Sequence, residues 1–175
     1  MRGQFRDLDL AVAPSGAAVL GWEWLWHDWG GRLLVTHRRG PAAAWVTPRR
    51  WDGMWEFDAL IGGSGLRAVA MHRQAGGRHR IQVIRGGLGR PWCDGPGRVP
   101  PRGRAGKVQG ARAAVAGGGS VVVGWRQKPA GGAWRPWASR APAGKAFRPP
   151  VALAPVGGRT ALPMQVLSSD RGSRW

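Results

Sequence analysis

Three carboxylates lie close together in the segment WDGMWEFD, residues 51–58. Side chains alternate between the two faces of a strand, so Glu56 and Asp58 would share one face with their side chains about 6–7 Å apart. Two carboxylates at such range are the groups that hydrolyse glycosidic bonds. Acids beside aromatic residues are far more often part of a solvated strand face. We therefore assign no catalytic role to Asp52, Glu56 or Asp58.

Tryptophans alternate in a second segment, GWEWLWHDW, residues 21–29. In a strand, Trp22, Trp24 and Trp26 would line one face. Indole rings in a row can stack on sugars, or on bases with help from arginine. The alternative is packing between sheets, because a buried Trp removes a large apolar area from water. Trp22 belongs to a repeated column described below, which favours burial and leaves Trp24 and Trp26 as candidates for stacking a ligand.

The other residue types that could hold a metal or act as a nucleophile are scattered. Cys93 is the only cysteine and has no Cys or His neighbour at zinc-site spacing. No G-x-S-x-G segment is present, and GGSG at residues 62–65 lacks the Lys-Ser/Thr that completes a phosphate-binding loop. The histidines lie apart in the sequence, at His27, His37, His72 and His79. The sequence therefore predicts no metal site and no cofactor.

An internal repeat must position these side chains. Three stretches align without gaps: LAVAPSGAAVLGW (10–22), ALIGGSGLRAVAM (59–71) and AAVAGGGSVVVGW (113–125). The aligned glycines are Gly16, Gly65 and Gly119, and the large apolar residues six positions later are Trp22, Met71 and Trp125. The glycines are 49 and then 54 residues apart. A period near 50 residues indicates propellers or related arrays.

Each repeat predicts four short strands. Two apolar runs flank the glycine turn, which supplies the positive φ of a tight hairpin. A second glycine turn leads to a third strand, and an aromatic residue followed by proline marks a fourth segment. The predicted fold is all-β, with antiparallel four-stranded repeats in one region spanning residues 1–175. The repeats cover approximately residues 8–56, 57–108, 109–160 and, in part, 161–175.

The repeat resembles the blades of bacterial β-propellers, in which apolar strands, a glycine turn and a Trp recur about every 50 residues. The resemblance implies an incomplete β-propeller, because three blades and a partial fourth fall short of the four to eight blades of a closed ring. We expect a fragment of a longer propeller, or a chain that closes with other chains. Open strand edges would favour such association.

The segment SSDRGSRW, residues 168–175, is similar to the Asp-box of sialidase-like propellers. The resemblance assigns Ser168, Asp170, Gly172 and Trp175 to a structural turn. Gly172 lies 53 residues after Gly119, so this turn continues the repeat. Sialidase chemistry would require a tyrosine nucleophile, and the chain contains no Tyr. The resemblance therefore supports the fold and not catalysis.

Charge is distributed unevenly along the chain. The net charge is +18, and residues 61–175 carry all of the excess, with 20 basic residues against Asp94 and Asp170. Such asymmetry indicates a surface that faces a polyanion. A GC-rich coding sequence, or a mistranslated GC-rich frame, also yields abundant Arg, Gly, Ala and Pro. The charge alone therefore leaves both interpretations open.

Three functions follow as hypotheses. The first is a non-catalytic propeller module that binds a carbohydrate or a protein. The second is a fragment of a sialidase-like glycoside hydrolase. The third is a protein that binds a polyanion, either nucleic acid or an acidic polysaccharide, through the basic residues 61–175. No segment approaches the roughly 18 apolar residues of a membrane span, and residues 1–12 lack the apolar core of a signal peptide. Only the resemblance points to an extracellular location.

Overall fold

The computed structural model describes residues 4–26, 30–62, 66–75, 78–87, 97–99, 107–116, 118–128 and 131–153. These residues form eleven strands and no helix, which confirms the all-β prediction. No helix that could span a membrane is found in this part of the chain. The strands are β1 Gln4–Val12, β2 Ala18–Trp26, β3 Gly30–Arg38, β4 Arg49–Ile61, β5 Arg67–Ala75, β6 Arg78–Gly86, β7 Gly97–Val99, β8 Lys107–Val115, β9 Val121–Lys128, β10 Arg135–Ala141 and β11 Val151–Ala152.

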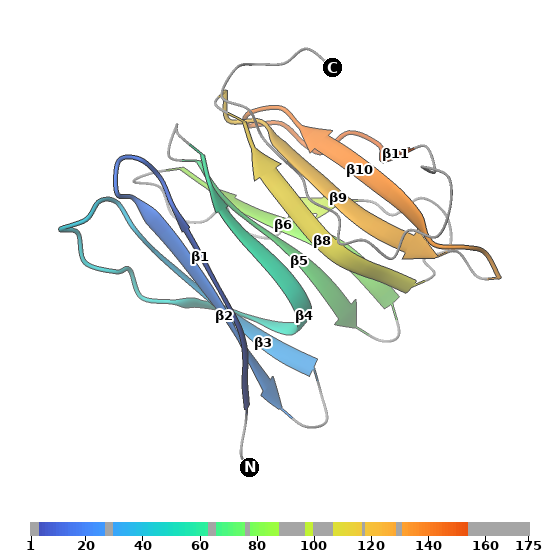
Figure 1. The fold of residues 1–175 in the computed structure, drawn as a ribbon, viewed down its shortest axis with the longest axis horizontal. Helices are drawn as coiled ribbons and strands as arrows, with labels where there is room; N and C mark the ends of the chain where they lie inside the picture. Colours follow the sequence, from blue (N-terminus) through green and yellow to red (C-terminus); the bar gives the residue numbers. More distant parts are fainter. Residues whose placement is uncertain are drawn as a thin grey trace.

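The strands form two antiparallel sheets (Figure 1). One sheet has seven strands in the order β1 to β7, and the other has four in the order β11-β10-β9-β8. Within each sheet, every strand therefore pairs with its neighbours in the sequence, and of the described strands only β7 and β8 are consecutive and do not pair. This is the pattern expected when short hairpins connect successive strands.

The long strand β4 divides the seven-stranded sheet into two groups. Arg49–Asp52 pairs with β3 and Met54–Ile61 pairs with β5, and Met54 itself pairs with both strands. Gly53 lies between the two halves with φ of 76°, a value that side chains with a Cβ rarely adopt. We call β1–β3 with the first half of β4 unit 1, the second half of β4 with β5–β7 unit 2, and β8–β11 unit 3.

The same backbone hydrogen bond closes the first hairpin turn in all three units. The donor N–H lies three residues before the aligned glycine, and the acceptor carbonyl lies one residue after that glycine. The three bonds run from Ala13 to Ala17, from Gly62 to Leu66 and from Ala116 to Ser120. Gly16 and Gly119 share a φ of 76°. The third glycine of the column, Gly65, lies outside the described residues. The aligned glycines thus mark a true structural repeat.

The units pack face to face, and two apolar clusters fill the spaces between them. Between units 1 and 2 lie Val19, Leu33, Val35, Met54, Phe57, Ala59, Val69, Met71 and Ile84. Between units 2 and 3 lie Ala68, Ala70, Ile81, Val83, Val99, Val108, Ala111, Ala113, Val115, Val121, Val123 and Trp125. The first strands of the units, β1, β4 and β8, pack in sequence beside one another (Figure 1).

The repeated large apolar residue is buried in two units out of three. Met71 and Trp125 have no exposed surface, as expected for residues between units. Trp22 is only half-buried, so the expectation that it would be core is wrong for this unit. The reason is its position: Met71 packs toward unit 1 and Trp125 toward unit 2, whereas no described element covers the corresponding face of unit 1.

Candidate functional site

The acids of the first strands accept hydrogen bonds from the backbone of the next unit. Asp9 accepts from the Ala59 N–H at 2.6 Å, and Asp58 accepts from the Ala113 N–H at 2.7 Å. Each Asp lies seven residues before the aligned glycine of its own unit. Each N–H group belongs to a residue that lies six residues before the aligned glycine of the next unit. These N–H groups are on the edge of the first strand, where β5 or β9 does not reach. The aspartates therefore satisfy strand edges that would otherwise stay open.

Glu56 makes a third contact of this kind. Its Oε2 accepts from the Gly110 N–H at 2.5 Å. Glu56 and Asp58 thus share a face of β4 and both reach β8, whereas Asp52 forms an exposed ion pair with Arg32 at 3.0 Å. Glu56 and Asp58 therefore hold units 2 and 3 together, whereas the Asp52 ion pair lies within unit 1.

The pairing register shifts at equivalent places in β1 and β4. The extra residue is Arg6 in β1 and Trp55 in β4, and each lies ten residues before its aligned glycine. β8 is also irregular, between Gln109 and Arg112. Side chains of a regular strand point alternately to its two faces, and the extra residue of a bulge interrupts this alternation. Bulges are frequent beside binding sites.

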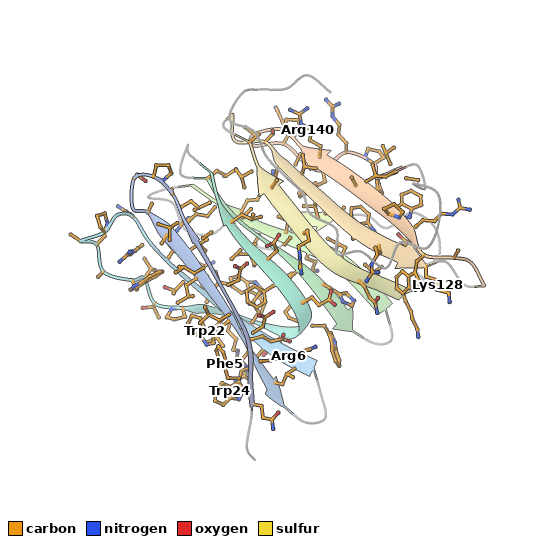
Figure 2. All side chains as sticks on the ribbon, viewed as in Figure 1. Phe5, Arg6, Trp22, Trp24, Lys128 and Arg140 are labelled. Carbon is orange, nitrogen blue, oxygen red and sulfur yellow. The ribbon has the colours of Figure 1, made fainter. Side chains whose placement is uncertain are left out.

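These irregular strand segments meet around one pocket. It has a volume of about 180 Å³ and is lined by Arg6, Trp55, Glu56, His72, Lys107, Val108 and Gln109. Arg6 lies on the β4 side of β1, and Phe5 and Trp24 lie on the opposite side (Figure 2). The pocket therefore draws on the first strands of all three units and on β5 of unit 2.

The pocket combines an aromatic ring, two cations, one acidic side chain and polar groups. Trp55 is 38% exposed, so its ring is available to a ligand. Arg6, Lys107 and Gln109 are exposed, whereas His72 is buried. Arginine, lysine and glutamine side chains can all donate hydrogen bonds, and two of the three are positively charged. The arrangement suits a small anionic ligand with a flat apolar face.

A second acid lies near the pocket without lining it. Glu23 of β2 is 1% exposed, and its Oε1 has no hydrogen-bond partner among the described residues. The pKa of Glu23 is raised to about 7, mainly by burial, with Arg6 opposing the shift and Asp7 and Glu56 adding to it. The carboxyl group is thus protonated over much of the acidic range. It adds little negative charge beside the pocket under those conditions.

The stacking candidates from the sequence lie elsewhere. Trp24 is 37% exposed and faces away from the pocket, on the same side of unit 1 as Trp22. Trp26 ends β2, and its side chain lies outside the described part of the structure. The turn residues Ser168, Asp170, Gly172 and Trp175 also lie outside the described residues. No group of three or more potential metal ligands occurs in the described ranges.

Sequence reasoning missed the residues that form the pocket. Arg6 and Trp55 escape a strict alternation because each is the extra residue of a bulge. The sequence feature that could have identified them is their common distance from the aligned glycines. This common distance is visible only when the repeats are compared column by column. Gln109 lies at the same distance from Gly119, whereas Lys107 carries no such mark.

No protein-family model matches the chain, and no curated protein sequence matches it.

Proposed function

We propose that the chain is a non-catalytic binding module, built from blades of β-propeller type, that binds a small acidic carbohydrate. The propeller is supported by the three four-stranded units, by the hydrogen bond that closes the first turn of each and by the side-by-side packing of their first strands. Propellers place the first strand of each blade beside a central axis and bind ligands near it. The pocket lies among these first strands.

The single observation that carries the ligand class is the pair of equivalent bulges. They bring the Trp55 ring and the Arg6 guanidinium to one pocket, where Lys107 adds a second positive charge. An indole ring stacks on the apolar face of a sugar, and the cations bind a carboxylate on its edge. The volume of about 180 Å³ is below the roughly 300–1,000 Å³ of drug-sized sites, which favours a single sugar ring.

The same pocket argues against hydrolysis. Glu56 is the only acid among its described lining residues, and its Oε2 already accepts a hydrogen bond from Gly110. Glycosidases of both stereochemical classes need two carboxyl groups that flank the scissile bond. The chain therefore suits recognition of a sugar better than its cleavage.

Titration with glucuronate and with glucose tests the proposal by calorimetry. Glucuronate should bind more tightly than glucose, because only glucuronate carries the carboxylate that Arg6 and Lys107 would neutralise. Trp55→Ala should weaken glucuronate binding by at least about tenfold, equivalent to about 1.4 kcal/mol. Trp45→Ala is the matched control, since Trp45 is 41% exposed and stacks with Arg38 away from the pocket.

Equal effects of the two tryptophan substitutions would contradict the proposal. So would glucuronate binding that is no tighter than glucose binding. A polyanion-binding function makes a different prediction: affinity for an acidic polymer should fall steeply between about 50 and about 200 mM salt, and Trp55→Ala should leave it unchanged.

A further inference from the structure

Unit 1 exposes a continuous apolar face. Across β1 and β2, Phe5 lies opposite Trp24, Leu8 opposite Trp22 and Leu10 opposite Leu20. Figure 2 shows Phe5, Trp22 and Trp24 gathered on this side of unit 1. The exposed fractions of Phe5, Leu8, Leu10 and Val12 lie between 51% and 56%. An exposed apolar patch of this kind marks an interaction site. We call it the outer face of unit 1.

The equivalent faces of units 2 and 3 are covered by the preceding unit. The counterparts of Leu8, Leu10, Leu20 and Trp22 are Phe57, Ala59, Val69 and Met71 in unit 2, which pack on unit 1. In unit 3 they are Ala111, Ala113, Val123 and Trp125, which pack on unit 2. The repeat therefore shows what fits this face: the opposite face of another unit of the same kind.

Unit 3 carries a face of that kind. The face of unit 1 that packs on unit 2 includes Val19, and the face of unit 2 that packs on unit 3 includes Ala68. Each of these residues lies three residues after the aligned glycine of its unit. The corresponding residue of unit 3 is Val122, which is half-buried, pairs with Ala114 of β8 and lies two pairs along the ladder from Arg112 and Gly124. Among the described elements, unit 3 packs on unit 2 with its other face.

The charged residues of the first strands favour a contact in which a unit 1 follows unit 3. Asp58 lies between Asp9 of the preceding unit and Arg112 of the following one, and both act on its carboxyl group. These three residues occupy the same position, seven residues before the aligned glycine. Arg112 therefore has Asp58 on one side, and by the same geometry a following unit 1 would place Asp9 on the other. An Arg between two carboxylates is favourable.

We infer that the outer face of unit 1 docks on the unit 3 of a second copy of the chain. The contact is head to tail, because unit 1 of one copy meets unit 3 of the other. A twofold axis would form the same contact a second time, between unit 3 of the first copy and unit 1 of the second. The resulting dimer is closed, and neither copy keeps an exposed outer face of unit 1. The inference rests on the repeat and its packing, and it stands whether or not the pocket binds a sugar.

Molar mass in solution is the first test. Light scattering on the full chain should give twice the 18.8 kDa chain mass. Leu10→Arg should return the mass to that of one chain, because it places a charge in the centre of the contact. Val46→Arg is the matched control: Val46 is 45% exposed, lies between β3 and β4 and should leave the dimer intact. A chain that stays monomeric over the accessible concentration range overturns the inference.

Disulfide trapping is the second test, and it does not depend on the Leu10 variant. Val19 of unit 1 and Val69 of unit 2 belong to the same cluster, and their counterparts across the proposed contact are Val122 and Leu20. In a Cys93→Ser background, Val122→Cys and Leu20→Cys chains should crosslink when mixed and oxidised, and neither should crosslink alone. Crosslinking of Leu20→Cys with itself would indicate that two outer faces meet, and would overturn the assignment of unit 3.

The charge argument has its own test. Arg112→Glu should raise the dimer dissociation constant by at least about tenfold, because it places three carboxylates together. Arg112→Lys should leave the constant nearly unchanged. Equal dissociation constants for the Glu and Lys variants would contradict the proposed proximity of Arg112 and Asp9.

Discussion

Glu23 is a buried acid whose carboxyl group lies close to a glycine. A Cβ on Gly31 would overlap its Oε1, so the carboxyl group fits only because a glycine lies opposite. Burial raises its pKa to about 7 from 4.5. The folded state therefore keeps the proton between about pH 4.5 and about pH 7, where the unfolded chain loses it. Stability contributed by the protonated form is complete below this window and is lost as pH rises through it.

Glu23→Gln should remove this part of the pH dependence. The amide cannot ionise, so the variant should gain stability relative to the parent as pH rises, by up to roughly 3 kcal/mol above about pH 7. Urea unfolding at about pH 5 and about pH 8.5 measures the difference. Asp52→Asn, at an exposed ion pair, is the control and should show a nearly constant difference. A constant difference for Glu23→Gln as well would show that the carboxyl group is not the cause.

Asp58 should matter for its oxygen more than for its charge. Burial raises its pKa, while the hydrogen bond from Ala113 opposes the shift. Asp58→Ala leaves the Ala113 N–H without its acceptor and should lower the free energy of unfolding by about 1–3 kcal/mol. Asp58→Asn keeps an acceptor oxygen and should recover most of the loss. Denaturant unfolding compares the two, and an equal loss in both variants would assign the effect to charge instead.

At the residue scale, the sequence indicated faces but not partners. Alternation placed Glu56 and Asp58 on one side of a strand, as the structure has them. Their partners, the N–H groups of Gly110 and Ala113, belong to a strand more than 50 residues away. Backbone N–H groups are present at almost every residue, so no sequence pattern distinguishes the two that are used.

At the scale of the strand and turn, the glycines were predictable and the bulges were not. A tight hairpin needs positive φ, which leaves a visible glycine at Gly16 and Gly119. The bulges at Arg6 and Trp55 use ordinary residues. The fourth strands, in contrast, follow the predicted aromatic–proline segments directly.

Gly16 should tolerate substitution less well than another glycine of similar backbone. A Cβ on Gly16 would lie 2.6 Å from Pro41 Cδ, whereas none of the nearby atoms would come within 4 Å of a Cβ on Gly131. The two have φ of 76° and 73°. Gly131→Ala should cost about 1–2 kcal/mol for the left-handed backbone alone, and Gly16→Ala should cost more because of the overlap. Thermal unfolding of both variants tests the ranking, and equal losses would show that Pro41 moves aside.

At the scale of the whole molecule, the repeat predicted the number of strands in each unit and their antiparallel order. It could not predict that one strand serves two units. Asp52-Gly53 is a dipeptide typical of turns, so the sequence indicates an interruption where the structure has one continuous strand. The repeat also could not show in which unit the residue at a usually buried position has no other unit packed against it. Trp22 and Trp125 match in sequence, and only the packing of units separates a half-buried ring from a buried one.

The strand β4 also sets how the molecule can come apart. Its backbone belongs to the ladders of both β3 and β5, so units 1 and 2 are joined by continuous hydrogen bonding. Unit 3 has its own ladder and meets unit 2 through side chains and the acid-to-backbone contacts. Amide exchange should therefore reveal two cooperative regions, with β8–β10 opening without β4 and with β3, β4 and β5 losing protection together.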